Sequence, residues 1–304
     1  MLTAGFRRSM VVFLAILLFM CVCGISGCTE NRAENKKEAD HMGAETVRID
    51  GKEMEYLHFG REGGEKFVIL PGLSLKSVMG SAEMIVPAYA LLAENYDIYL
   101  FDHIKDEPEG YDIKGMAEDT LAAFDRLGLD RVHLMGVSMG GMVAQTIAAD
   151  EPDRVSSLIL CSTAMNTAHS DQDLFAGWEE LAGAKDTPAL MASFGERVYT
   201  PSFYEAYKDI IIASGEGATD RDYANFMISL KAVKNFDISK ETDKISCPAY
   251  VIGAGEDRVL GTQAAGDLAA ALKCECFVYE GFGHGVYDEA PDYLSHIDAF
   301  LKES

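Results

Sequence analysis

Basic residues are scarce in this chain. Its 304 residues include 26 lysines and arginines against 49 aspartates and glutamates, which gives a formal net charge of -23 at pH 7. So acidic a surface repels the phosphates of nucleic acids and of anionic lipid head groups. We therefore expect no nucleic-acid partner and no attraction to an anionic membrane surface.

The cysteines lack the spacing of a metal site, and we expect neither a metal nor another cofactor. Four of the seven lie in the folded part of the chain: Cys161, Cys247, Cys274 and Cys276. Cys161 closes one predicted parallel strand, whereas the other three stand where strands begin. A disulfide from Cys247 to Cys274 or Cys276 stays open, but buried free thiols are the favoured interpretation.

The N-terminal apolar run is too short for a permanent membrane span. It extends from Met10 to about Cys23, follows two arginines, and falls below the roughly 20 residues that a bilayer requires. This pattern is typical of a cleaved signal peptide, which we place at residues 1–27. The polar, charged segment 28–44 then resembles a flexible tether.

The end of this segment resembles a bacterial lipoprotein processing site. Ser26 and Gly27 directly precede Cys28, which would become the acylated first residue of the mature protein. Two or more acyl chains on one residue give stable anchoring. We expect an exported protein that is held by Cys28 on the outer face of a bacterial membrane, with plain secretion as the alternative.

From residue 45 onward, apolar runs alternate with amphipathic segments. The opening pair, 46–49 and 53–58, is predicted to form an antiparallel hairpin through Asp50-Gly51. The later strands are continuous apolar runs, as in a parallel sheet buried on both faces, at 66–70, 96–101, 132–135, 155–161, 249–252 and 275–279. Residues 163–240 interrupt this α/β core, 45–162 and 241–304, with a pattern of helices only.

The stretch Gly136-Val-Ser138-Met-Gly140 joins a predicted strand to a predicted helix. A serine on so sharp a turn is held out of the sheet in a strained conformation, and small residues two positions before and after it let the turn close. The N-terminus of the next helix offers N–H groups to a developing negative charge. This arrangement predicts that Ser138 is a nucleophile.

A serine nucleophile needs a histidine base that a carboxylate orients. Glycine-rich loops follow the strands at 249–252 and 275–279, at the sheet edge where ligands gather; one carries Glu256 and Asp257, the other His284. His284 is the predicted base, while the acid is open among Asp257, Glu256 and Asp102. The other histidines are weaker candidates, although His58 and His103 could line the site: His41, His58, His103, His133, His169 and His296.

In this order of residues, Ser138, Asp257 and His284, the chain resembles the α/β-hydrolase family. Phe67-Val-Ile-Leu-Pro-Gly72, Gly255-Glu-Asp257 and Gly283-His284 each match the family's pattern at its expected place. The resemblance implies a mostly parallel, eight-stranded sheet with helices on both faces. It also selects Asp257 as the acid of the triad.

The same resemblance implies two further assignments. The backbone N–H groups of Leu73 and Met139 would form the oxyanion hole, with Pro71-Gly72 standing where many relatives have His-Gly. Residues 163–240 would form a helical cap over the active site, and its aromatic side chains would divide between packing and an apolar substrate pocket.

The predicted function is that of a serine hydrolase, which cleaves a carboxylic ester or related acyl bond of a small molecule through an acyl-enzyme. Lactonase, thioesterase, acyltransferase, carbon–carbon hydrolase and peptidase activities stay open, because fold does not fix reaction. The alternative from another class is a non-catalytic lipoprotein that binds or senses a small molecule in the same pocket. The intact set of three catalytic residue types argues for the enzyme.

Overall fold

The computed structural model describes residues 43–304. The predicted signal peptide, Cys28 and nearly all of the predicted tether lie outside the described residues. Within 43–304, no helix combines the length and the apolarity needed to cross a bilayer.

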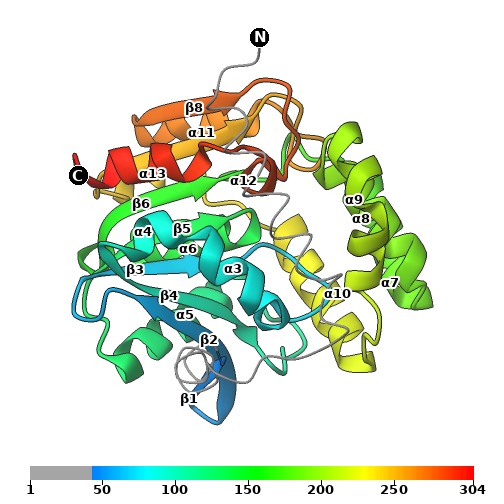
Figure 1. Cartoon of the computed structure of the whole chain (residues 1–304), viewed down its shortest axis with the longest axis horizontal. Helices are drawn as coiled ribbons and strands as arrows, with labels where there is room; N and C mark the ends of the chain where they lie inside the picture. Colours follow the sequence, from blue (N-terminus) through cyan, green and yellow to red (C-terminus); the bar gives the residue numbers. More distant parts are fainter. Residues whose placement is uncertain (1–42) are drawn as a thin grey trace, which may run out of the picture.

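One eight-stranded sheet forms the centre of the molecule (Figure 1). Its strands, in chain order, are β1 (Glu45–Ile49), β2 (Lys52–Gly60), β3 (Glu65–Leu70), β4 (Tyr96–Ile104), β5 (Val132–Val137), β6 (Val155–Cys161), β7 (Ala249–Ala254) and β8 (Glu275–Tyr279). The spatial order is β1-β2-β4-β3-β5-β6-β7-β8. β2 runs antiparallel to both β1 and β4, and every other pairing is parallel. The predicted mostly parallel eight-stranded sheet is confirmed.

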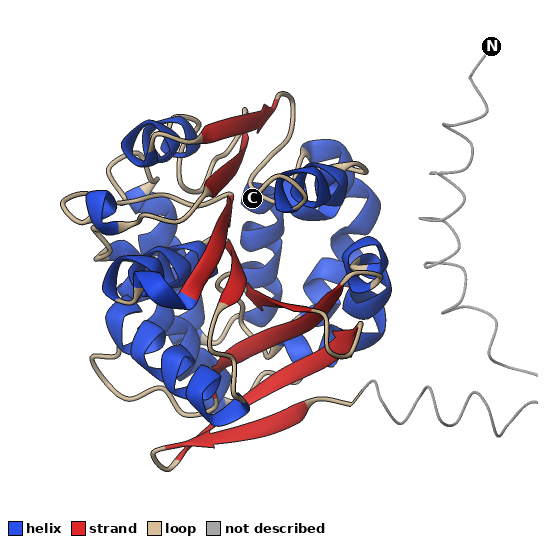
Figure 2. Cartoon of the chain, turned by 90° about the vertical axis from the view of Figure 1, so that its left-hand side faces the viewer, coloured by secondary structure: helices blue, strands red, loops and turns tan. Residues whose placement is uncertain are grey.

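Helices cover both faces of this sheet (Figure 2). One face packs against α5 (Ile113–Leu127), α6 (Met139–Asp150) and α11 (Ala264–Leu272), and the other against α3 (Ala82–Ala88), α4 (Ala90–Ala93), α12 (Val286–Glu289) and α13 (Tyr293–Leu301). Short 3-10 turns complete the core at η2 (Val78–Ser81), η3 (Pro152–Arg154) and η4 (Thr242–Lys244). Every residue of β5 is buried, as its continuous apolar run requires.

Four helices follow β6 and precede β7 in the sequence and lie at the right of Figure 1; we call them the cap. They are α7 (Gln172–Ala184), α8 (Thr187–Val198), α9 (Pro201–Ser214) and α10 (Asp220–Lys234). Each begins at a residue whose side chain accepts a hydrogen bond from a first-turn N–H, the usual reason for Asp or Thr at that position: Asp171, Asp186, Thr200 and Thr219. These side-chain hydrogen bonds stabilise the start of each of the four helices.

One face of α10 binds the loop that follows β4. Arg221 pairs with Asp106 at 2.7 Å, and Asn225 bonds both the N–H of Glu107 and the carbonyl of Lys105. One turn further, the Ser229 hydroxyl lies 2.9 Å from both carboxylate oxygens of Glu107. Burial raises the pKa of this carboxyl above its usual value. The spacing 221, 225, 229 places all three contacts on a single helix stripe.

Two sequence predictions of helices differ from the structure. The helical stretch expected around 83–95 is divided into α3 and α4, because Pro87 lies inside α3 and Tyr89 has non-helical dihedral angles at the junction. The short helix α12 directly follows the loop of His284, and the sequence pattern does not predict it. The closing helix, expected from about Pro291, begins at Tyr293.

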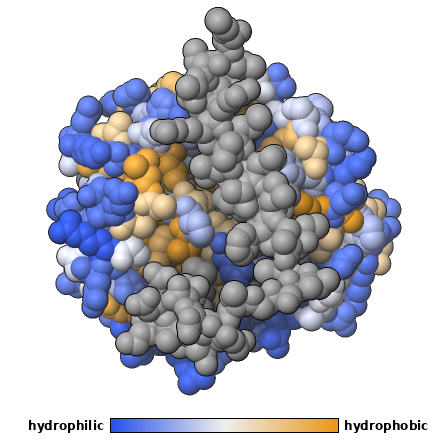
Figure 3. Space-filling view, in the orientation of Figure 1, coloured by the Kyte–Doolittle hydropathy of each residue, from blue (hydrophilic) through white to orange (hydrophobic). Residues whose placement is uncertain are grey.

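Polar residues dominate the rim of the face seen in Figure 3, and apolar residues gather toward its middle. Few large apolar side chains in the described residues are well exposed: Met84, Leu91 and Ile210. Scattered exposures of this kind are normal for a folded surface.

Candidate active site

Ser138 occupies a strained turn between β5 and α6. Its φ of 52° and ψ of -118° lie outside the regions that L-residues ordinarily populate. The surrounding contacts impose this conformation: the Ser138 N–H donates to the Cys161 carbonyl, and the Thr163 hydroxyl donates to the Ser138 carbonyl at 2.7 Å. The serine is thereby fixed with its side chain above the carboxyl ends of the strands.

The two flanking glycines are required by close backbone approach. A Cβ on Gly136 would lie 2.3 Å from the Gly140 carbonyl oxygen, and one on Gly140 would lie 2.2 Å from the Leu70 carbonyl oxygen. No side chain larger than hydrogen fits at such separations. The spacing in the sequence therefore follows from contact between the end of β3, the end of β5 and the start of α6.

The structure brings Ser138, His284 and Asp257 together in one hydrogen-bonded chain. His284 Nε2 lies 2.9 Å from Ser138 Oγ, and its Nδ1 lies 2.8 Å from Asp257 Oδ2. The side chains come from loops after β5, β8 and β7, 146 and 27 residues apart in the sequence. Parallel strands end at the same edge of the sheet, and so these distant segments meet there.

Asp257 is held as a charged carboxylate. Burial alone would raise its pKa, but the charge and hydrogen bond of His284 and the N–H groups of Leu260 and Val259 outweigh that cost and lower the pKa below its usual value. The two N–H groups both donate to Oδ1, at 2.9 and 2.8 Å. Oδ2 is thus left for His284, and the carboxylate orients the ring so that Nε2 faces the serine.

The residues with the predicted oxyanion donors flank the serine. A Cβ on Gly72 would lie 3.2 Å from Ser138 Cβ, and so the Pro71-Gly72-Leu73 segment rests against the nucleophile turn. Among the described residues, neither the Leu73 N–H nor the Met139 N–H donates to a main-chain carbonyl in a turn, loop or helix cap. Met139 is the first residue of α6, where N–H groups lack intrahelical partners.

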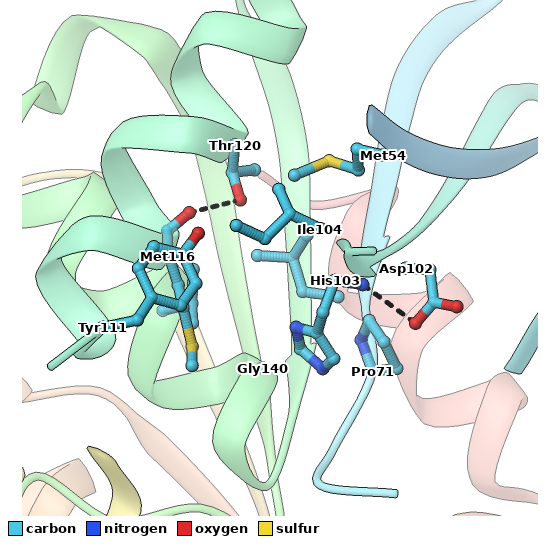
Figure 4. Close-up of a pocket in the computed structure, with 11 residues that line it drawn as sticks. Met54, Pro71, Asp102, His103, Ile104, Tyr111, Met116, Thr120 and Gly140 are labelled. Carbon is cyan, nitrogen blue, oxygen red and sulfur yellow. Dashed lines mark hydrogen bonds between the residues drawn. The ribbon is translucent and has the colours of Figure 1, made fainter. Parts of the chain in front are cut away.

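The alternative acids and bases lie elsewhere. Asp102 accepts a hydrogen bond from the His103 N–H, and the His103 ring lines a small pocket together with Pro71 and Gly140 (Figure 4). Its Nε2 is buried without a partner among the described residues. His58, His133, His169 and His296 all have other partners, respectively Asp97, Ser157, Asp267 and Asp292. His41 lies outside the described residues.

An apolar pocket opens beside the serine, and the space inside it that a water molecule can reach is about 30 Å³. The cap contributes three aromatic side chains, Phe175, Trp178 and Phe194, together with Val198 and Val233. The core contributes Leu73, Val259, Leu260 and Tyr287 beside Ser138 and His284. No lysine or arginine is among these described lining residues.

Sequence reasoning missed the aliphatic half of this pocket. Val259 and Leu260 directly follow Asp257, and so their position beside the acid was a usable signal. Val198 and Val233 are single valines within helical patterns, and only the packing of the cap on the core distinguishes them from ordinary core residues. Tyr287 lies on the unpredicted helix α12.

The cysteines and the possible metal ligands contribute nothing to this site. All four described cysteines are free thiols; Cys161 is buried as predicted, whereas the other three are half-buried. Burial raises the pKa of the Cys161 thiol to about 12. In the described part of the chain, no three His, Cys, Asp or Glu side chains are placed to share a metal ion.

This fold, with a serine, a histidine and an aspartate joined above one sheet edge, defines a hydrolase. The chain belongs to the α/β-hydrolase family, because the family model described as alpha/beta hydrolase fold matches residues 67–291.

Named relatives span most of the chain. A protein of Pseudomonas syringae pv. syringae named "Putative carbamate hydrolase RutD" is 26% identical over 245 residues, which cover 76% of this chain and 94% of the relative. The enol-lactonase of Burkholderia xenovorans superposes with a TM-score of 0.72 at 22% identity, over 85% of this chain and all of that one. An esterase of Exiguobacterium antarcticum does so with a TM-score of 0.72 at 22% identity, over 84% and 98%.

Proposed function

We propose that the protein is a serine esterase that hydrolyses small, neutral esters through an acyl-enzyme intermediate. The observation that carries the proposal is the hydrogen-bonded order Ser138–His284–Asp257, with 2.9 and 2.8 Å between successive side chains. A serine hydroxyl is a poor nucleophile until a base in contact takes its proton. Here the base is already in place.

The reaction has two halves. Ser138 Oγ bonds to the ester carbonyl carbon while His284 Nε2 takes the hydroxyl proton; the imidazolium then gives this proton to the departing alcohol as the carbon–oxygen bond breaks. In the second half, a water molecule loses a proton to His284 and attacks the acyl carbon. The carboxylic acid leaves and Ser138 regains its proton.

Charge develops in two places during each half. The carbonyl oxygen becomes an oxyanion, which the N–H groups of Leu73 and Met139 stabilise from the two sides of the serine turn. The imidazole becomes positive, and the buried Asp257 carboxylate stabilises it. The serine turn and the Asp257 carboxylate do not have to reorganise, because main-chain hydrogen bonds already hold both of them.

The pocket favours an apolar acyl group of modest size. Its walls are aromatic and aliphatic, and the space inside it that a water molecule can reach, about 30 Å³, leaves room for only a small group. A carboxylate buried among such walls would lack a cation, and its desolvation would oppose binding. We therefore expect uncharged esters to be preferred over esters that carry an acidic group.

The named relatives support hydrolysis of an acyl-type bond and divide on its nature. One is named as a carbamate hydrolase, one as an enol-lactonase and one as an esterase. The lack of a cation in the pocket favours the ester. A purely binding protein would have no need for a buried carboxylate aligned with a histidine and a serine.

Ser138→Ala tests the mechanism, with Ser162→Ala as its matched control. Ser162 also follows a strand, has a positive φ of 45° and is buried, but its hydroxyl has no partner among the described residues. We expect Ser138→Ala to abolish both turnover of a short-chain nitrophenyl ester and labelling by a fluorophosphonate, and Ser162→Ala to retain both. Turnover that survives in Ser138→Ala would reject the mechanism.

A further inference from the structure

The turn between α8 and α9 touches both of the loops that carry Asp257 and His284. We call residues 196–200 the cap corner. Its contacts consist of main-chain and side-chain hydrogen bonds, distributed over the loop after β7, the loop after β8 and helix α12. A cap that only covered the substrate would not need hydrogen bonds to these two loops.

Arg258 makes the contact on the Asp257 side. Its Nη2 donates to the carbonyls of Glu196, at 2.6 Å, and Tyr199, at 2.8 Å. Carbonyls at the end of a helix have no intrahelical partner and carry partial negative charge, which a guanidinium satisfies well. Since Arg258 directly follows Asp257, its two bonds fix the loop immediately beside the carboxylate.

Two glycines make the contact on the His284 side. The Gly285 N–H donates to the Val198 carbonyl at 2.7 Å. A Cβ on Gly285 would lie 2.6 Å from the Tyr199 ring, and one on Gly283 would lie 2.8 Å from the Val198 carbonyl oxygen. The glycines on either side of His284 are therefore needed for contact with the cap, in addition to access to the serine.

Helix α12 extends the same contact. The Tyr199 hydroxyl donates to Asp288 at 2.8 Å, and both the N–H and the hydroxyl of Thr200 donate to Glu289, at 2.9 and 2.5 Å. The Val198 side chain, in turn, lines the substrate pocket. The cap corner thus faces the substrate with one side chain while its backbone holds the two loops.

We infer that the cap corner is a positioning element of the active site, and that Arg258 is its positioning residue on the Asp257 side. The inference depends on the proposed triad and deepens it. Asp257, His284 and Ser138 must meet within hydrogen-bond distance, and an error of about 1 Å in such geometry costs about 10²-fold in rate. The loops bond to each other directly through the Glu256 N–H and the Phe282 carbonyl, 2.9 Å apart, and the cap corner braces this pair from outside.

The test compares Arg258→Ala with Arg154→Ala in the full-length protein. Arg154 also donates to two main-chain carbonyls, those of Asp130 and Leu129, but at the opposite end of the sheet. For Arg258→Ala we expect kcat for a nitrophenyl ester and the rate of fluorophosphonate labelling to fall about tenfold or more, with KM changed by less than about twofold. Arg154→Ala is expected to lose thermal stability with unchanged kcat.

Two further variants keep the inference testable if Arg258→Ala does not fold. Arg258→Lys retains a donor for the carbonyls and is expected to recover part of the lost kcat, whereas Tyr199→Phe removes only the hydroxyl contact with Asp288 and is expected to lower kcat. Wild-type kcat in every folded Arg258 and Tyr199 variant would overturn the inference. A wild-type protein that turns over no ester would instead overturn the proposed function.

Discussion

Replacement of Asp257 by asparagine should inactivate the site, because it moves the ring proton of His284 from Nδ1 to Nε2. Asp257 Oδ1 accepts the N–H groups of Val259 and Leu260, and only the oxygen of an amide can keep that role. The amide nitrogen of Asn would therefore face His284 Nδ1, where Oδ2 now lies at 2.8 Å. Nδ1 must then accept, and so the ring proton moves to Nε2.

A proton on Nε2 prevents His284 from taking the proton of Ser138. Loss of the correct tautomer costs about 10⁴-fold in kcat in serine hydrolases with this arrangement, or about 5.5 kcal/mol of transition-state stabilisation. Steady-state kinetics with a nitrophenyl ester, over a range of pH, measures the loss. The folded structure should change little, because Asn keeps the shape of Asp and the two N–H bonds.

The surface pair of His169 and Asp267 supplies the matched control for this experiment. Asp267 Oδ2 lies 2.8 Å from His169 Nε2, the same separation as in the buried pair, but both side chains are well exposed and neither lines the pocket. Asp267→Asn should leave kcat within about twofold of wild type, since exposed pairs contribute little. If Asp257→Asn retained more than a tenth of wild-type kcat, the assignment of Asp257 as the orienting acid would be wrong.

Three further predictions concern packing, titration and anchoring. Gly140→Ala should lower stability by about 1–3 kcal/mol and reduce activity, because its Cβ would lie 2.2 Å from the main-chain oxygen at the end of β3; Gly183→Ala, with open space around it, should do neither in denaturation and kinetic assays. Because burial raises the pKa of Glu107 in the folded protein, wild type should lose unfolding free energy relative to Glu107→Gln as pH rises above the ordinary carboxyl pKa of 4.5; urea unfolding that shows the same pH dependence in both proteins would contradict this. Cys28→Ala should release the protein from bacterial membranes and end palmitate labelling. Cys23→Ala should keep both the membrane attachment and the palmitate labelling.

The sheet was predictable because burial on both faces leaves continuous apolar runs, as in 155–161. The positions of Ser138 and His284 followed from local rules, since a strained turn needs its glycines and a parallel sheet gathers its loops at one edge. In the sequence, only the family resemblance favours Asp257 over Glu256. The structure supplies the reason for the choice: the carboxylate must accept two successive N–H groups and still reach the histidine.

The contacts between cap and core could not be predicted, because they depend on how separate segments meet in space. Arg258 looks like an ordinary exposed arginine in the sequence, and its partners are main-chain carbonyls, which every residue has. Pro87 and Tyr89 show a related limit, since the sequence predicts helix around them without fixing where it breaks. The two roles of Val198 could not be predicted either: its backbone carbonyl binds the loop of His284, and its side chain lines the pocket.

The cap is fastened to the core at several places, among them residues 196–200, which bind the loops of the triad, and α10, which binds the loop after β4. A lid that swung open as a rigid body would have to break both sets of bonds, including the buried contact of Ser229 with Glu107. Entry should then depend on rotation of individual side chains at the rim rather than on hinge motion. An entrance that does not open by hinge motion selects substrates by size. Bulky esters should therefore enter slowly and react slowly, even where their ester group is reactive.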